Sequence, residues 1–212
     1  MSKIDVRIFG VPERLFQIEK NKKILGLPDN RIFMDYEHIG CAPTAFRTWS
    51  YSDEESQSAT HIMVLSDDVE LCEDFMSYCY RIIAAHPDKI ISFFPLTLAK
   101  RSQVSRLPTR TPYVQVESCS GAAIMMPAQY VKPCMDFWDH KIRGDDTNIT
   151  RWAKANDIKI LTTLPSIIQH LDVVSIFDPL RNLGGTEFFE PHPSYLNWDD
   201  DYYTPWTNIE RW

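Results

Sequence analysis

Two adjacent carboxylates after an apolar run are the first residues in this chain that could do chemistry. Asp67 and Asp68 follow the segment THIMVL (60–65) through Ser66. An apolar, β-branched run bounded by polar residues predicts a buried strand that ends at the edge of a sheet. Two like charges there repel each other unless a divalent cation, or a phosphate ligand carrying one, lies between them. The alternative is a solvated loop in which Asp68 caps a helix that begins near Glu70.

Further candidate groups fall at the ends of other predicted elements. Asp35 ends a short apolar stretch, Asp145 and Asp146 precede a helical pattern, and His170 follows the last predicted strand. Ligands of open α/β sheets collect beyond the carboxyl ends of the strands, so these groups could converge on one crevice. Carboxylates with one imidazole suit Mg²⁺ or Mn²⁺ better than a structural zinc. The alternatives are an N-cap of the helix over 147–155 for the acidic pair and a hydrogen-bonded structural role for His170.

The elements that must position these groups alternate along the chain. Sequence patterns predict strands over 3–11, 31–36, 60–65, 89–94, 121–127 and 158–165. They predict helices over 12–26, 43–51, 70–87, 128–142 and 145–157, and a loop over 96–114. This alternation predicts an α/β fold with a mostly parallel central sheet flanked by helices. We expect a single domain over 1–177 and an irregular C-terminal tail over 178–212 that wraps over it.

Composition limits the classes of function. The chain has 212 residues, 44% of them hydrophobic, and a net charge of −7, which argues against a general nucleic-acid binder. No segment approaches the apolar length of a membrane span, and the N-terminal residues lack the apolar core of a signal peptide. From these two features we expect no membrane association. The five cysteines have no metal-finger spacing and an odd count, so we also expect reduced thiols and a cytoplasmic location.

Positive charge is concentrated in one segment. Between Asp88 and Glu117 the sequence has no acidic residue, whereas Arg101, Arg106 and Arg110 all fall there. This segment is predicted to be either a local anion site or a solvated loop.

The order of these motifs resembles the GT-A family of nucleotide-sugar glycosyltransferases. The resemblance covers roughly residues 4–175 and is carried by VLSDDVEL (64–71), SCSGAAIMMP (118–127), GDDTNITRWA (144–153) and TTLPSIIQHL (162–171). It implies a Rossmann-like GT-A domain, a nucleotide-sugar donor, most simply a UDP-sugar, and a Mn²⁺ or Mg²⁺ ion. Ser66 departs from the pattern, because many members have a third acidic residue there. The departure weakens the ribose or metal contact assigned to that position.

The resemblance assigns the donor side of the site. Pro12 and Arg14, after the first strand, would lie near the nucleotide, and Asp35 would pair with its base. Asp67 would lie near the ribose, and Asp68 would bind the metal.

The resemblance also assigns the catalytic and acceptor side. Asp146 is the first choice for the base that takes the proton of the acceptor hydroxyl, and Asp145 is the second. His170 would be a second metal ligand. The small residues Ser120 and Gly121 would let a sugar approach the backbone.

The acceptor is left open. The chain is similar to compact phage-type members, some of which glycosylate hydroxymethylated pyrimidines in DNA, which would place it in a host cytoplasm. Arg101, Arg106 and Arg110 would then contact a DNA backbone, or would close over the donor diphosphate. A glycan or lipopolysaccharide-type acceptor is the alternative.

Two other classes of function compete with this interpretation. A nucleotidyltransferase also places paired acids and Mg²⁺ beneath a nucleotide, although that class usually opens with a glycine-rich basic loop, and FGVPERL (9–15) has one glycine. A noncatalytic module that binds a cation or nucleotide is the other. Hydrolysis of a nucleotide-sugar donor would distinguish a glycosyltransferase from a binding module. Transfer of a nucleotidyl group would identify a nucleotidyltransferase.

Overall fold

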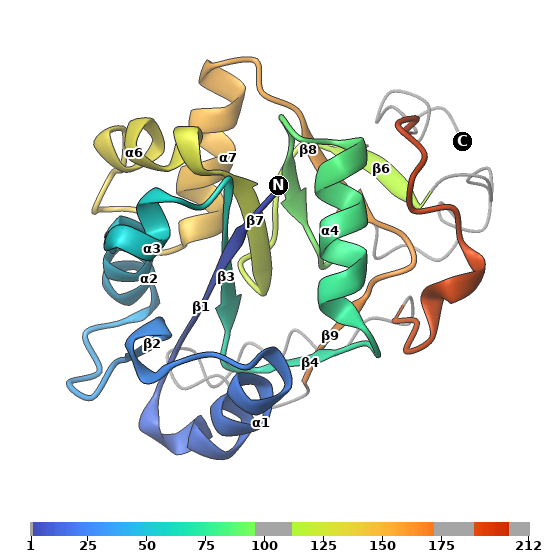
Figure 1. Cartoon of the computed structure of the whole chain (residues 1–212). Helices are drawn as coiled ribbons and strands as arrows, with labels where there is room; N and C mark the ends of the chain where they lie inside the picture. The colour runs from blue at the N-terminus through green and yellow to red at the C-terminus, as the bar shows by residue number, and fades with distance from the viewer. Residues whose placement is uncertain (1, 96–111, 172–188, 204–212) are drawn as a thin grey trace.

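A computed structural model describes residues 2–95, 112–171 and 189–203 of the chain (Figure 1). Its strands are β1 (Ile4–Gly10), β2 (Ile32–Met34), β3 (His61–Ser66), β4 (Val69–Leu71), β5 (Ile90–Ser92), β6 (Tyr113–Val116), β7 (Ala123–Pro127), β8 (Ile160–Thr163) and β9 (Ile168–His170). Its α-helices are α1 (Leu15–Leu25), α2 (Cys41–Ser50), α3 (Glu54–Gln57), α4 (Phe75–Ala85), α6 (Ala128–Asp136) and α7 (Asp145–Ala155). Short 3₁₀ turns are η1 (Pro12–Arg14), η2 (Asp29–Arg31) and η4 (Pro193–Tyr195).

A seven-stranded sheet in the order β2-β1-β3-β7-β5-β8-β6 forms the centre of the molecule. Strands β1, β2, β3, β5 and β8 run in one direction, whereas β7 and β6 run against them. The predicted α/β class is confirmed. The sheet is more mixed than the mostly parallel sheet predicted, because β7 lies antiparallel between β3 and β5 and therefore contributes two antiparallel pairings.

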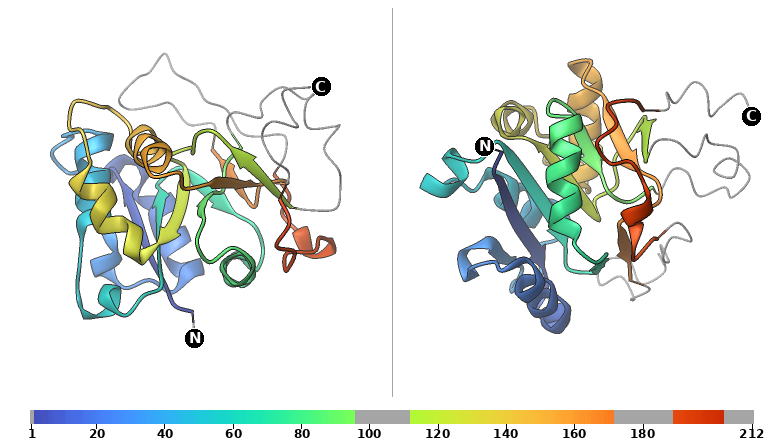
Figure 2. Two further views of the ribbon diagram at one scale, coloured as in Figure 1. Left: turned by 90° about the horizontal axis from the view of Figure 1, so that it is seen from above. Right: turned by 45° about the vertical axis from the view of Figure 1, so that its right-hand side comes forward.

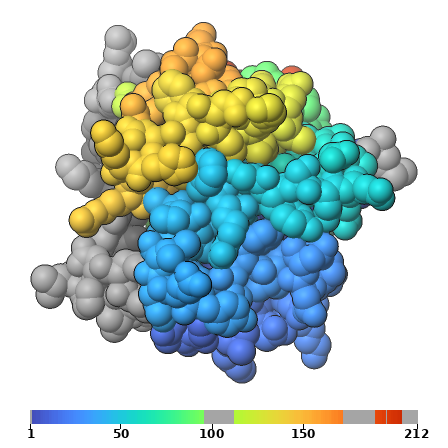
Figure 3. All heavy atoms as spheres, turned by 90° about the vertical axis from the view of Figure 1, so that its left-hand side faces the viewer, coloured from blue at the N-terminus to red at the C-terminus, as the bar shows by residue number. Residues whose placement is uncertain are grey.

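Helices cover both faces of this sheet. On one face α1 and α4 pack through buried residues such as Ile18 and Ile82, and on the other α2, α6 and α7 pack through Trp49, Cys134 and Trp152. Figure 2 shows the two layers of helices on either side of the strands. Figure 3 looks directly onto the second layer, with α6 and α7 above α2 and α3. The carboxyl edge of the parallel strands lies between these layers.

The region after β3 differs from the prediction. The helix predicted over 70–87 begins only at Phe75, and residues 69–71 form strand β4, which pairs with β9. Val69 and Leu71 are buried on either side of the half-buried Glu70, which is the alternation of a strand. Asp68 therefore does not cap a helix at Glu70.

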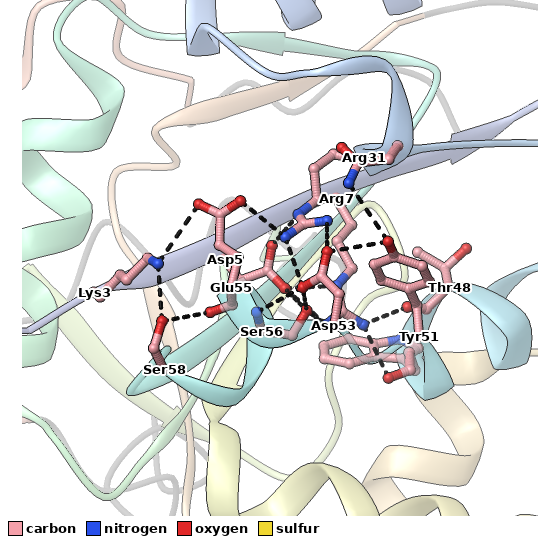
Figure 4. A network of polar contacts seen from close by, with 12 residues as sticks. Lys3, Asp5, Arg7, Arg31, Thr48, Tyr51, Asp53, Glu55, Ser56 and Ser58 are labelled. Carbon is pink, nitrogen blue, oxygen red and sulfur yellow. Dashed lines mark hydrogen bonds and ion pairs between the residues drawn. The ribbon is translucent and has the colours of Figure 1, made fainter.

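Strand β1 carries two buried charges whose partners come from η2 and α3 (Figure 4). Asp5 accepts hydrogen bonds from Arg7 Nη2 at 2.7 Å and from Arg31 Nε at 2.6 Å. Arg31 also donates to Asp53 Oδ2 at 2.8 Å. Removing one partner of a buried ion pair typically costs about 3–5 kcal/mol, because it leaves a buried charge uncompensated. The network therefore ties the start of β1 to the segment that leads into β3.

Part of the predicted tail packs against the α4 face. Trp198 is fully buried, its ring contacts those of Tyr78 and Tyr113, and its carbonyl oxygen accepts a hydrogen bond from the Tyr113 hydroxyl. The division at residue 177 stays a prediction, since residues 172–188 and 204–212 lie outside the described residues. None of the helices in the described part of the chain has both the length and the apolar character needed to cross a bilayer.

Candidate active site

The carboxyl ends of β1 and β3 lie side by side and bring the predicted donor residues together. The two strands are parallel and pair Phe9 with Ser66, so Val11 and Asp67 come next to each other just beyond the sheet. The Val11 backbone N–H donates to Asp67 Oδ2 at 2.9 Å. A side chain at Gly10 would not fit, because its Cβ would lie 2.3 Å from the Cβ of Asp67. The close approach of the two strand ends requires glycine there.

Arg14 is the positive partner of the first acidic pair. The 3₁₀ turn η1 places its Nη1 2.7 Å from Asp67 Oδ1 and 2.6 Å from Asp68 Oδ2. Burial raises the pKa of Asp67, the charge of Asp68 raises it further, and the Arg14 guanidinium opposes both effects. The sequence pattern identified the like-charge pair but not the arginine that neutralises it.

His170 lies against Asp68 because β9 pairs with β4. The register sets Val69 opposite His170, and His170 Nε2 comes 3.4 Å from Asp68 Oδ2. The other carboxylate oxygen, Asp68 Oδ1, accepts a hydrogen bond from the Ser66 hydroxyl at 2.7 Å. The Nδ1 atom of His170 is buried and has no hydrogen-bond partner among the described residues. The structure thus brings together the two residues predicted to bind a metal.

The second acidic pair forms the first turn of α7, with Gly144 as the N-cap residue. Asp145 is only 2% exposed, and its carboxylate accepts hydrogen bonds from Trp49 Nε1 at 3.4 Å and the Asp146 backbone N–H at 2.9 Å. Burial, followed by the charge of Asp146, raises the pKa of Asp145 to about 7. Asp146 is half-buried and accepts the Thr147 backbone N–H at 2.6 Å. Both acids therefore bind backbone donors, although neither is the N-cap residue itself.

The charges of both acidic pairs act on Cys41, the first residue of α2. After burial, the negative charges of Asp145, Asp146, Asp68 and Asp67 are what raise the pKa of the Cys41 thiol.

The segment of Ser120 and Gly121 connects the end of β3 to the second acidic pair, and its predicted contact with an acceptor stays a prediction. The Ser66 backbone N–H donates to the Ala122 carbonyl at 2.9 Å, which joins this segment to the end of β3. A Cβ on Gly121 would lie 2.8 Å from Asp145 Oδ1, so the glycine allows the buried carboxylate to lie against the backbone. The Ser120 backbone N–H donates to the Ser92 hydroxyl at 2.9 Å.

Asp35 and Pro12 border the same edge. Asp35 is buried, and its two carboxylate oxygens accept the backbone N–H groups of Ile39 and Gly40, each at 2.9 Å. These bonds shape the loop that leads into α2. Pro12 begins η1, which positions Arg14. Asp35 has a structural role in this loop whether or not it also pairs with a base.

Two features of the site were not predicted. Trp49, interpreted as a core residue, is fully buried but also donates to Asp145, and Cys41 was not singled out. An indole N–H in a helical apolar pattern is the one signal that could have suggested a partner for Trp49. The basic residues Arg101, Arg106 and Arg110 fall outside the described residues.

Comparison with known proteins gives no family for this chain. No protein-family model matches it, and no curated protein sequence matches it significantly. Interpretation of the site therefore rests on its own geometry.

Proposed function

We propose that this protein is a glycosyltransferase that moves a sugar from a nucleotide-sugar donor to an acceptor hydroxyl. The observation that carries the proposal is the grouping at one sheet edge of Asp67, Asp68, Arg14 and His170. A second carboxylate pair is connected to this group through the backbone of Gly121 and Ala122, which contacts Asp145 on one side and the end of β3 on the other. In the first group Arg14, together with a divalent cation on Asp68 and His170, would bind a diphosphate, and a carboxylate of the second pair can accept a proton. These are the two requirements of glycosyl transfer from a nucleoside diphosphate.

The donor atoms fit a divalent cation that the substrate helps to hold. Two neighbouring ligands of an octahedral ion at about 2.1 Å lie about 3 Å apart, and Asp68 Oδ2 and His170 Nε2 are 3.4 Å apart. Within the described residues no three His, Cys, Asp or Glu side chains form a complete cage. A site with two protein ligands is typical of Mg²⁺ or Mn²⁺ bound together with phosphates. When bound, the ion would stabilise the negative charge of the leaving diphosphate.

Asp146 is the better placed of the two candidate bases. It is half-buried and can be reached by a hydroxyl, whereas Asp145 is enclosed by Trp49, Gly121 and the Asp146 backbone. With a pKa raised to about 7 by burial, Asp145 carries a proton in much of the protein at neutral pH. We therefore assign proton removal to Asp146 and a supporting role to Asp145.

A donor screen by mass spectrometry with Mn²⁺ tests the proposal, with hydroxymethylated DNA and glycans as acceptors. We expect transfer, or slow donor hydrolysis, by the wild type. Asp68→Ala should abolish the reaction and weaken metal-dependent nucleotide binding without unfolding the protein. Glu70→Ala is the matched control, because this half-exposed acid pairs with Lys20 instead.

The other outcomes are equally informative. Turnover at the wild-type rate by Asp68→Ala would refute the site. Transfer of a nucleotidyl group from a triphosphate would identify a nucleotidyltransferase, and nucleotide binding without any turnover would identify a binding module.

A further inference from the structure

Arg14 and His170 face the same oxygen of Asp68. Asp68 Oδ2 lies 2.6 Å from Arg14 Nη1 and 3.4 Å from His170 Nε2, while Oδ1 is occupied by the Ser66 hydroxyl. We propose that Arg14 competes with the divalent cation for Asp68, so that the cation enters as Arg14 moves from Asp68 to the donor's diphosphate. This inference rests on the proposed function, because it assigns the order of events at the same site.

The competition follows from charge and from the number of available oxygens. A cation that binds both Asp68 Oδ2 and His170 Nε2 would lie next to the guanidinium that now holds the same oxygen. Two positive groups that contact the same carboxylate oxygen repel each other strongly in a partly buried site. The cation therefore gains its full binding energy only after Arg14 has left Asp68.

Arg14 can leave Asp68 without exposing an unpaired acid at Asp67. Asp67 keeps the backbone N–H of Val11 at 2.9 Å, so it does not depend on the guanidinium alone. A phosphate group in the site offers Arg14 a new partner, and arginine binds phosphates through two parallel hydrogen bonds. The cation and the donor thus favour each other's binding, and this coupling is reciprocal.

The test measures the binding of Mn²⁺ alone, without nucleotide, by the loss of the free-ion electron paramagnetic resonance signal. Arg14→Gln should bind Mn²⁺ about ten- to a hundredfold more tightly than the wild type, since it removes one charge-assisted hydrogen bond to the ligand oxygen. Arg14→Lys keeps a positive charge beside Asp67, so its affinity for Mn²⁺ should lie between those of the wild type and Arg14→Gln. It serves as the second variant if Arg14→Gln does not fold.

The matched control is Lys20→Gln. Lys20 lies on α1 and pairs with the exposed side of Glu70 at 3.3 Å, so its loss changes the net charge by the same amount without touching Asp68. We expect its affinity for Mn²⁺ to stay within about threefold of the wild type, because exposed charges are screened. Adding Asp68→Asn to Arg14→Gln should cancel the gain.

Several results would overturn the inference. One is that the wild type and both Arg14 variants bind Mn²⁺ with equal affinity. Another is that Lys20→Gln gains as much affinity for Mn²⁺ as Arg14→Gln does. The third is that the gain of Arg14→Gln in Mn²⁺ affinity remains when Asp68→Asn is added. Failure of the proposed function is a separate result, because it would appear as no reaction with any donor while the Mn²⁺ affinities of the variants still differ.

Discussion

Asp145 should make the stability of the protein depend on pH, and Asp145→Asn should remove that dependence. The pKa of Asp145 is raised by burial from 3.8 to about 7. A raised carboxyl pKa means that the folded protein holds the proton more tightly than the unfolded chain does. The stabilisation is therefore complete below the unfolded pKa and is lost as the pH rises through the folded one.

The size of the effect follows from the shift. Each pKa unit is worth about 1.4 kcal/mol, so a shift of about three units corresponds to a contribution on the order of 4 kcal/mol. Between pH 5 and pH 8.5 about 3 kcal/mol of it should be lost. The asparagine variant does not ionise, but it offers one acceptor oxygen to two donors, Trp49 Nε1 and the Asp146 N–H. That mismatch should cost about 1 kcal/mol at every pH.

The two stability curves should therefore cross. Urea unfolding at a series of pH values, followed by circular dichroism, should show Asp145→Asn less stable than the wild type by about 1 kcal/mol near pH 3 and more stable by about 3 kcal/mol at pH 8.5. The other titrating groups contribute equally to the pH dependence of both proteins, so their contribution cancels in the difference between the two stabilities.

Asp157→Asn is the matched control at the far end of the same helix. Asp157 is exposed, and its backbone has a φ of 51°, a conformation that asparagine tolerates well. Its stability should follow the wild type within about 0.5 kcal/mol. A constant difference between the wild type and Asp145→Asn across the series would refute the reasoning, because it would mean that Asp145 is already charged at pH 5.

Three further predictions concern Gly10, Asp146 and the basic residues Arg106 and Arg110. Gly10→Ala should lose about 1–3 kcal/mol in thermal unfolding, because its new Cβ would lie 2.3 Å from Asp67; unchanged stability would contradict the close approach. Asp146→Asn should bind donor almost normally but lose roughly 10²–10⁴-fold in turnover, and normal turnover would reduce the acidic pair to a helix-end role. If the acceptor is DNA, Arg106→Gln combined with Arg110→Gln should lower the salt slope of acceptor binding by about two; a raised donor KM with an unchanged slope would place the loop on the diphosphate instead.

Much of the fold was predictable because its longer strands are apolar runs bounded by polar residues or proline, and its longer helices have apolar residues at helical spacing. The strands at β1, β3 and β8 and the helix at α7 were predicted close to their observed bounds, and the α/β class followed from their alternation. The short strands β4 and β9 were not predicted. Each has three residues, which is too few for a period of two to be distinguished from the start of a helix.

The orientation of β7 could not be derived from its own residues. AIMMP (123–127) is buried throughout, so its sequence has no alternation that would separate a parallel from an antiparallel neighbour. The sequence therefore predicted the α/β class and the central sheet, but not which strands of the sheet run antiparallel.

The partner of the acidic pair depends on which strands are neighbours, and the local sequence does not contain that information. The carboxylates at the end of β3 were predictable from THIMVLSDD, but Arg14 lies more than fifty positions earlier in the chain. Once β1 is known to be parallel to β3, with Phe9 opposite Ser66, the residues just after each strand must meet beyond the same edge. Pro12 then turns the chain into η1, which directs Arg14 back over Asp67 and Asp68. A cation was the natural inference from the sequence, because two adjacent acids need a positive charge. The structure supplies that charge from within the chain through Arg14, and the chemistry that we propose for the site depends on where this arginine goes when a divalent cation binds.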